Sequence, residues 1–572
     1  MVLIKYIPKQ YWRNLPSAVD DYQNQIILSG NNWNDYGLQT SFNMLVVLNG
    51  KEYRDWSIKI LIEEVKDSAE FLDQLCLDGW DGVFPIPNKN YVSLFSDIDF
   101  YKSLTGGLGL LEASNMLKVF NEASYVKNIL QDYNALLLIE SLDFSNSLLR
   151  GPGAHKSYED AWKLFSEMPE NLINDFIFNY QGRDGLIKEI KFNFMEDILP
   201  SDINVLIGVN GIGKTYTLKV LIDFLLEINI GDTKRLEREK FKPFDKRPNF
   251  SKIILISYSV FEDFLIDIID QHVKDKSSYK YFGLRTRRSL NESDEDFKKV
   301  AIGKHIPSLD ATKSIFKMIY ENYQFGEQDW WINKFELATE TLRKAFDFDE
   351  IIYKVNEDFS EHRKYCFIEL GNERYLVLNS NLEKNYNIWD RFFSQSDSTL
   401  EFYKNNKIIN LSSGQKIFTY IVLNILGEIK KESLILIDEP ELFLHPNLEI
   451  EFIGLLKSIL KPFNSKAILA THSLSIVREI PSRCVHIYKG DEDKELGVHI
   501  LNPPFQTFGG DMQRISTYVF SDTLLNKPYE IFLNELLESG KYLPNDLIKK
   551  LGGELNEEMI MDIKIWDSIN GN

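Results

Sequence analysis

Short apolar runs recur in the C-terminal two thirds of the chain and predict the strands of one sheet. The runs Ile203–Ile207, Ile253–Ile256, Leu434–Ile437 and Ala467–Ala470 are almost entirely apolar. Strands without polar alternation are typical of parallel sheets that helices cover on both faces. The sequence therefore predicts an α/β core with a mixed, mostly parallel sheet over residues 185–505.

The first 184 residues have a different pattern and predict a separate α+β domain. Two apolar-rich runs, Ser41–Leu48 and Lys51–Ile62, are joined by Asn49-Gly50, a pair that favours the tight turn of a β-hairpin. Asp67, followed three residues later by Glu70, is typical of the capping box that opens a helix. No motif in this domain assigns it a ligand, and its aromatic and acidic residues suit a packed core with a solvated face equally well.

Two regions extend the predicted core. Residues 257–400 form an insertion that the spacing of apolar residues predicts to be mostly helical, with a hairpin-like stretch at 366–378. Residues 506–572 form a C-terminal helical segment, with helical patterns at 529–537 and 546–551. Breaks near Lys527-Pro528 and Ser539-Gly540 separate these helices from the core, so the segment is a candidate docking site for a partner.

The strongest chemical signal follows the run Ile203–Ile207. Residues 208–215 read GVNGIGKT and fit the phosphate-binding P-loop G-x-x-x-x-G-K-[ST], with a helical pattern directly after them. Glycines let backbone N–H groups curl around phosphates, Lys214 reaches the β- and γ-phosphates, and Thr215 reaches Mg²⁺. A glycine-rich turn could match by accident, but both the strand and the helix are in place. The expected nucleotide contacts are Gly208, Asn210, Gly211, Ile212, Gly213, Lys214, Thr215 and Tyr216.

Three more motifs follow in a fixed order. Residues 411–415 read LSSGQ before a helical pattern, Asp438-Glu439-Pro440 ends one apolar run, and Thr471-His472-Ser473 ends another. Parallel strands deliver such residues to one edge of a sheet, where ligands of these folds bind. Each motif alone has an ordinary reading as a turn or a structural histidine. Together, and in this order, they resemble the motif set of a known class of nucleoside triphosphatases.

These motifs resemble those of ABC-type ATPases over residues 185–505, with Ser413 in place of the first glycine of the signature LSGGQ. The resemblance implies an ATP- and Mg²⁺-dependent homodimer in which the signature of one subunit completes the site of the other. Asp438 and Thr215 would hold Mg²⁺, Glu439 would polarise the attacking water, and His472 would sense the γ-phosphate, with Lys214 as the phosphate clamp. The residues expected to act on the partner's nucleotide are Ser412, Ser413 and Gly414.

The residues after Glu439 favour a soluble branch of this family. Glu441-Leu-Phe-Leu-His445-Pro446 differs from the Ser-Ala-Leu-Asp-like loop of transporter subunits, which disfavours a transporter role. It resembles the overcoming-lysogenization-defect, RecF-like and SMC-related ATPases, and within them the PtuA ATPases of Septu and retron-associated anti-phage systems. Two departures matter. No confident Q-loop glutamine follows Ile253–Ile256, and no nuclease domain follows the core, so we expect the chain not to be a nuclease itself.

The composition of the chain limits the kinds of partner that we expect for it. The formal net charge of -20 excludes a chain coated in nucleic acid but allows a local basic track. The three cysteines match no zinc or redox spacing, no apolar run approaches the ~20 residues of a membrane helix, and we expect a cytoplasmic protein without a membrane anchor. Two basic clusters are usually no more than solvated faces, yet they are the candidate DNA track: Lys234, Arg235, Arg238, Arg285, Arg287 and Arg288.

The leading hypothesis is an ATPase that acts as the regulatory or sensor subunit of an anti-phage complex and controls a separate nuclease effector of the HNH type. DNA or a retron nucleic acid is a further possible partner. The alternative is a DNA-repair or DNA-tethering ATPase of the RecF or SMC kind that contacts DNA through the basic insertion.

Overall fold

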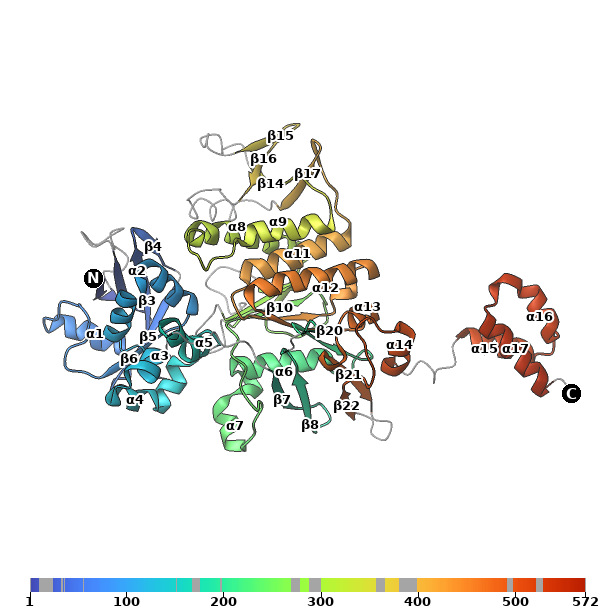
Figure 1. Ribbon diagram of the computed structural model, residues 1–572, viewed down its shortest axis with the longest axis horizontal. Coiled ribbons are helices and arrows are strands. Elements are labelled where there is room, and N and C mark those ends of the chain that lie inside the picture. Colours follow the sequence, from blue (N-terminus) through green and yellow to red (C-terminus); the bar gives the residue numbers. More distant parts are fainter. Residues whose placement is uncertain are drawn as a thin grey trace. The chain divides into compact units, whose positions relative to one another are not determined.

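The computed structural model describes two compact units, residues 1–509 and 510–572 (Figure 1). The residues that it describes are 2–9, 24–31, 34, 37–54, 56–150, 152–166, 175–195, 198–268, 278–287, 300–355, 366–379, 399–490, 497–520 and 528–570. Arg288, which belongs to the candidate DNA track, lies outside them.

A six-stranded sheet organises the N-terminal region. Its order is β1-β2-β3-β5-β6, with β4 paired to β3, and only β1 and β2 are parallel neighbours. Asn49 and Gly50, which join β3 to β4, both have positive φ (50° and 78°), so the predicted hairpin turn is confirmed. The strands are β1 Leu3–Tyr6, β2 Gln25–Gly30, β3 Ser41–Leu48, β4 Lys51–Tyr53, β5 Ser57–Ile62 and β6 Tyr91–Phe95.

Helices cover both faces of this sheet because its strands are apolar on both. Along β5, Ile60 packs into one apolar cluster and Leu61 into another on the opposite face. Asp67 caps α1 by accepting the backbone N–H of Glu70 at 2.9 Å, which is one of the two hydrogen bonds of the predicted capping box. The helical segments are α1 Ser68–Leu77, α2 Ile98–Val119, α3 Ala123–Tyr125, η2 Val126–Leu130, α4 Tyr133–Ile139, η3 Phe144–Leu148, α5 Pro152–Asp160 and η4 Ala161–Phe165.

The central sheet confirms the predicted α/β core. Seven strands lie in the order β11-β10-β19-β20-β9-β21-β22, and every neighbouring pair is parallel except β21 and β22. The four predicted apolar runs are β9, β10, β19 and β20. The strands are β9 Ile203–Ile207, β10 Ile253–Ser257, β11 Tyr279–Gly283, β19 Leu434–Asp438, β20 Lys466–Thr471, β21 Val485–Gly490 and β22 Val498–Leu501.

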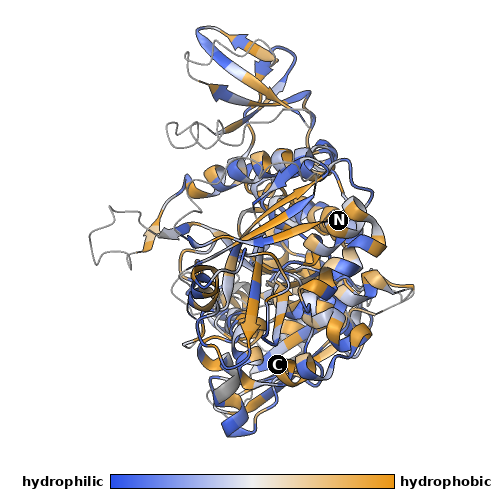
Figure 2. Cartoon of the chain, turned by 90° about the vertical axis from the view of Figure 1, so that its left-hand side faces the viewer, coloured by the Kyte–Doolittle hydropathy of each residue, from blue (hydrophilic) through white to orange (hydrophobic). Residues whose placement is uncertain are grey.

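Helices α6 and α11 lie on opposite sides of this sheet (Figure 1). The face toward α6 is one large core cluster that includes Leu206, Leu255 and Leu436, and Figure 2 shows the central strands as mostly hydrophobic. The cluster begins at Phe176, upstream of residue 185, because β7 pairs with β8 along its whole length. The elements are β7 Phe176–Gln181, β8 Ile187–Phe192, α6 Lys214–Leu226, η5 Asn229–Gly231, α7 Thr233–Glu239, α11 Ser413–Glu428, η8 Pro440–Phe443, α12 Pro446–Leu460, η9 Lys461–Phe463, α13 Leu474–Arg478 and η10 Ser482–Cys484.

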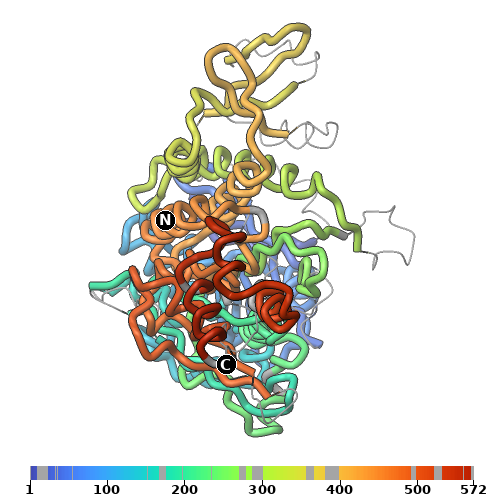
Figure 3. Tube along the Cα trace, turned by 90° about the vertical axis from the view of Figure 1, so that its right-hand side faces the viewer, coloured from blue at the N-terminus to red at the C-terminus, as the bar shows by residue number. Residues whose placement is uncertain are grey.

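The region between β10 and α11 contains more strand than the expectation of a mostly helical insertion. Its helices α8 and α9 pack on α11, but β11 joins the central sheet and five short antiparallel strands form a second sheet in the order β15-β16-β14-β17-β18. The yellow and gold trace of this second sheet is at the top of Figure 3. These strands mix polar and apolar residues, so their sequence shows no clean alternation. The elements are β12 Arg285–Arg287, β13 Val300–Ile302, α8 Ile306–Phe325, α9 Lys334–Ala345, β14 Glu350–Val355, β15 Phe367–Leu370, β16 Glu373–Leu378, β17 Leu400–Lys404 and β18 Lys407–Ile408.

The C-terminal unit has a small core of its own. Leu533, Leu537, Leu547 and Ile563 are buried against one another, and α17 contacts both α15 and α16. The helical segments are α14 Met512–Phe520, α15 Pro528–Glu538, α16 Pro544–Leu551, η11 Gly552–Glu554 and α17 Glu557–Asn570. Across the described parts of both units, no helix has the length and apolar character needed to span a membrane.

A histidine is buried in the central sheet beside the P-loop strand. His486 on β21 has its Nε2 3.0 Å from Asn204 Oδ1 and its ring against Phe192 at 5.3 Å between centroids. Burial lowers the pKa of His486 from 6.5 to about 3. The folded protein therefore keeps this imidazole neutral down to far lower pH than the unfolded chain does.

We expect this histidine to make stability fall with acidity. Between pH 6.5 and about pH 3, His486 is protonated in the unfolded chain but neutral in the folded protein. The free energy of unfolding therefore falls by about 1.4 kcal/mol for each pH unit in this range. Thermal unfolding at pH 8 and pH 5 should show a drop about 2 kcal/mol larger in wild type than in His486→Gln. The control His499→Gln, at an exposed position, should match wild type; an equal drop in all three proteins would refute the assignment.

Candidate nucleotide-binding site

The loop after β9 has the backbone shape that phosphate binding needs. Gly211 and Gly213 have φ of 76° and 111°, a left-handed conformation that glycine adopts without strain. Gly208 is required for a different reason, because a Cβ there would lie 2.7 Å from the carbonyl oxygen of Tyr488. Asn210 and Gly211 are exposed at the tip, Ile212 packs against the core, and α6 begins at Lys214.

The ammonium of Lys214 lies folded over this loop. Its Nζ is 3.1 Å from the carbonyl oxygen of Gly208, 3.2 Å from that of Val209 and 2.8 Å from His472 Nε2. Burial lowers the pKa of Lys214 to about 8, against the opposing effect of Glu439 and Asp438. A bound phosphate would place a full negative charge near Nζ in place of the neutral carbonyl oxygens. It would thereby raise the pKa of Lys214 back toward its usual value.

A hydroxyl and a carboxylate meet beside it. Thr215 Oγ1 donates to both oxygens of Asp438, at 3.0 and 3.1 Å, across the gap between α6 and β19. Burial, and next the neighbouring Glu439 carboxylate, raise the pKa of Asp438 to about 7. Hard oxygen ligands of this kind fit Mg²⁺, which takes few protein ligands and completes its shell with water and phosphate oxygens.

Glu439 and His472 form the third part of the site. His472 Nε2 lies 3.5 Å from Glu439 Oε1, and hydrogen bonding to His472 is the largest cause that lowers the pKa of Glu439. Glu439 has φ of 51°, and its backbone N–H donates to the carbonyl oxygen of Ala470 at 2.8 Å. A non-glycine residue held in this conformation costs on the order of 1 kcal/mol and is typical of functional positions.

The sequence prediction did not include two further carboxylates. Glu441 accepts the backbone N–H of His472, and burial raises its pKa; its other oxygen is buried and has no partner among the described residues. Glu262 accepts the hydroxyls of Ser257 and Tyr281, the latter at 2.6 Å, and burial raises its pKa to about 7. Ser257 is paired in register with Asp438, so Glu262 stands at the same edge where a Q-loop glutamine was sought.

An arginine from the β7–β8 turn also borders the P-loop helix. The guanidinium of Arg183 lies 5.2 Å from the ring centroid of Tyr216, and the Tyr216 hydroxyl donates to the carbonyl oxygen of Gln181 at 3.3 Å. The pairing of β7 with β8, which a motif search does not reveal, brings this arginine to Tyr216.

The signature residues stand apart from the loop residues in a single chain. Ser412 caps α11 in a complete capping box: its Oγ accepts the Gln415 N–H at 3.3 Å, and Gln415 Oε1 accepts the Ser412 N–H at 3.0 Å. Ser412 and Ser413 are exposed and Gly414 is half-buried. Because α6 and α11 lie on opposite sides of the sheet, the two motifs do not begin on the same face of the molecule.

The basic residues of the candidate DNA track have local partners where the structure describes their side chains. Arg235 donates to the carbonyl oxygen of Ile230 and lies 3.8 Å from Glu239. Arg285 donates to the carbonyl oxygens of Glu262 and Phe264, at 2.8 and 3.2 Å, which fixes the loop that carries Glu262. Lys234 and Arg238 lie on α7 and Arg287 on β12, and a role in DNA binding stays a prediction.

The arrangement fits ATP and Mg²⁺ on its own geometry. The left-handed glycines leave the loop backbone free to face a polyanion, one ammonium is held above it, and the Thr215–Asp438 oxygen pair adjoins it. Glu439 is the carboxylate best placed to act on water, since it is half-buried and keeps a low pKa.

Comparisons with known proteins found one matching family and several individual proteins that are similar to this chain. Residues 203–478 match the family described as "AAA domain, putative AbiEii toxin, Type IV TA system". The chain is 25% identical over 549 residues to "Protein ea59" of Escherichia phage lambda, over 94% of this chain and 93% of that protein. It is 23% identical over 195 residues to "Probable ABC transporter ATP-binding protein p29" of Mesomycoplasma hyorhinis, over 32% and 70% of the two chains. A solved SMC head bound to the C-winged helix domain of ScpA aligns at 12% identity over 58% of this chain and 98% of that chain, with a TM-score of 0.27.

Proposed function

We propose that this chain, whose residues 203–478 form an ATPase domain of the AAA family, is an ATP-driven dimerisation switch. The observation that carries the proposal is a set of contacts at one edge of the central sheet, where β9, β19 and β20 end. The residues in contact are Lys214, Thr215, Asp438, Glu439 and His472. These contacts supply a phosphate clamp, a cation site and a water-orienting carboxylate.

Each side chain then has a defined task. Lys214 neutralises the β- and γ-phosphates. Thr215 and Asp438 would hold Mg²⁺, which would offset charge on the phosphate oxygens. Glu439 orients a water and takes its proton as the water oxygen bonds to the γ-phosphorus and the bond to the ADP oxygen breaks. His472, in contact with both Lys214 and Glu439, links the phosphate clamp to the base.

The exposed signature supports a site shared between two subunits. Ser412 and Ser413 stand at the N-terminus of a sixteen-residue helix, where backbone N–H groups and the helix dipole attract an anion. In one chain they are exposed, on the other side of the sheet from α6. A second copy that presents its signature to this P-loop would complete each nucleotide site.

We further propose that the switch acts in conflict between phage and host, as the regulatory subunit for a separate nuclease effector. The name of the matched family, which includes a toxin, and the full-length similarity to a phage lambda protein support this setting. The ATPases of Septu and retron-associated systems, which the motifs resemble, provide the analogy for an HNH nuclease partner. The C-terminal unit is the proposed docking element because it exposes Phe532, Met561 and Ile565 beside its own core.

Replacing the catalytic carboxylate should separate binding from hydrolysis. We expect Glu439→Gln to bind ATP as wild type does, to lose turnover by about 10²-fold or more because the base is gone, and to form an ATP-stabilised dimer. Turnover, nucleotide binding and mass with ATP and Mg²⁺ would be measured. The exposed control Glu451→Gln should behave as wild type. Wild-type turnover in Glu439→Gln would remove this residue from the mechanism.

The shared site can be tested by mixing two inactive proteins. Lys214→Ala lacks the phosphate clamp and Ser412→Arg blocks the signature, so each homodimer should be inactive. A mixed dimer carries one intact composite site, and an equal mixture should recover about a quarter of wild-type turnover by random pairing. If subunit exchange is demonstrated and turnover stays at background at every ratio, each chain hydrolyses ATP without its partner's signature.

The docking role of the C-terminal unit predicts a charge-sensitive interaction. Phe532→Asp and Met561→Asp introduce charge at exposed apolar positions. Each should weaken capture of the proposed HNH nuclease partner at least about tenfold while ATP turnover is kept. Asn545→Asp adds the same charge at an exposed polar site of α16 and should have no effect. Unchanged capture by both apolar-site variants would place the nuclease elsewhere.

A further inference from the structure

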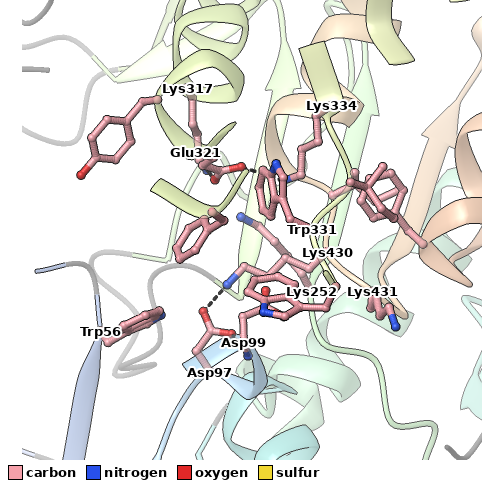
Figure 4. A pocket seen from close by; sticks show the side chains of 16 residues that line it. Trp56, Asp97, Asp99, Lys252, Lys317, Glu321, Trp331, Lys334, Lys430 and Lys431 are labelled. Atoms are coloured by element: carbon pink, nitrogen blue, oxygen red, sulfur yellow. Dashed lines mark hydrogen bonds and ion pairs between the residues drawn. The ribbon is translucent and has the colours of Figure 1, made fainter. Parts of the chain in front are cut away.

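A cavity of about 310 Å³ lies where the N-terminal sheet, helices α8 and α9, and the N-terminal ends of β10 and β19 meet. It is distinct from the P-loop site, which occupies the carboxyl ends of the same parallel strands. Figure 4 shows Trp56 and Asp97 entering it from the N-terminal region and lysines entering it from the ATPase core. The volume is at the lower end of small-molecule sites and suits a ligand no larger than a mononucleotide.

Aromatic rings make up one wall of the cavity. Phe325, at the end of α8, lies 5.6 and 5.2 Å between ring centroids from Trp330 and Trp331, and 6.0 Å from Trp56. Trp330 Nε1 is buried and has no hydrogen-bond partner among the described residues. Such a wall offers aromatic contact surface to a planar ring, and the buried indole N–H offers a donor to an acceptor atom of that ring.

The cavity is also lined by positive charge, and one of its lysines, Lys334, has its Nζ 5.2 Å from the ring centroid of Trp331. Five lysines from four segments line the cavity against three carboxylates, on a protein whose formal net charge is -20. Two of the carboxylates pair with lysines of the cavity, Asp97 with Lys430 and Glu321 with Lys334 at 2.8 Å (Figure 4). The third, Asp99, pairs with Lys102 at 3.0 Å. The lysines that line the cavity are Lys252, Lys317, Lys334, Lys430 and Lys431.

Burial makes this surplus costly for the protein alone. Burial lowers the pKa of Lys252 to about 8, even though Glu428 pairs with it. Glu428 also accepts from Lys317 at 2.8 Å, so one carboxylate serves two ammonium groups. Despite the burial of Lys317, the attraction of Glu428 raises its pKa, so the cost falls on Lys252. An anion in the cavity would help to hold Lys252 protonated.

The cavity is also connected to the nucleotide machinery by one rigid element. Helix α11 begins at the signature, directly after Ser412, and ends at Glu428, which is followed by the cavity residues Ile429, Lys430 and Lys431. Its sixteen residues span about 24 Å. Ser314 of α8 donates to Asn424 at 2.9 Å, and a Cβ on Gly427 would lie 2.6 Å from Ser314, so α8 and α11 are in close contact beside the cavity.

We propose that this cavity is an effector site for a nucleoside monophosphate, with the base against the Phe325–Trp330–Trp331 wall and the phosphate among the lysines. Stacking suits the planar base, the buried indole N–H suits a base acceptor, and the lysine surplus suits a single phosphate. Through α11, occupancy would shift the signature that completes the partner's ATP site. The binding site is independent of the proposed ATPase, and only its coupling rests on that function.

Binding is tested on the full chain with the P-loop disabled by Lys214→Ala. AMP, GMP, CMP and UMP would each be titrated by calorimetry and by quenching of tryptophan fluorescence. At least one should bind with micromolar affinity, and adding Lys431→Glu should weaken it at least about tenfold, by removing one positive charge and adding a negative one. Lys461→Glu is the matched control, since that exposed lysine near the cavity does not line it.

Different results would overturn the binding site and its coupling to ATP turnover. Absence of binding by all four nucleotides at millimolar concentration, or equal affinity in the Lys431→Glu and Lys461→Glu proteins, overturns the site. Trp330→Phe keeps an aromatic ring but removes the indole donor, and it should weaken binding without changing the unfolding midpoint. This second variant tests the site even if Lys431→Glu fails to fold. In wild type, the bound monophosphate should change ATP turnover at least twofold, and this response should vanish in Lys431→Glu; binding without that response overturns the coupling alone.

Discussion

The register of three parallel strands is the constraint on which the catalytic edge depends. Ile207 pairs with Thr471, and Ala470 pairs with Asp438, so the P-loop, His472 and the two carboxylates leave the sheet at the same level. A shift of one residue in any strand would turn the polar residue to the other face and separate it from Lys214. The apolar runs, buried on both faces, fix this register, because every slip would also expose or misplace core side chains.

The edge that results holds several buried charges at close range. One lysine faces Asp438, Glu439 and Glu441, and its pKa is lowered while that of Asp438 is raised. Both shifts show that the charged forms are unfavourable in the protein alone. A polyphosphate with a divalent cation would stabilise these charged forms, because it brings negative charge to the lysine and positive charge to the carboxylates. The network is therefore better suited to recruit a ligand than to stabilise the empty fold.

The sequence predicted the parts whose chemistry is local and left out those that depend on distant contacts. The apolar runs and their terminal motifs identified β9, β10, β19 and β20, and the Asn49-Gly50 turn and the Asp67 cap are equally local. Glu262 was not predicted because its place follows from the pairing of β10 with β19, and Arg183 was not because it comes from a hairpin. The second sheet has mixed strands without a period, and the lysines of the cavity come from segments that only folding brings together.

The left-handed backbone at Glu439 limits which residues evolution can place there. In an extended strand, consecutive side chains point to opposite faces, so Asp438 and Glu439 could not both serve one edge. The turn at φ of 51° ends the alternation, and Asp438 contacts Thr215 while Glu439 contacts His472. Asparagine and glycine tolerate this geometry better but carry no base, and aspartate has a shorter reach. Any of these replacements would lower the cost of the backbone conformation only by losing the carboxylate that contacts His472 or by shortening its reach.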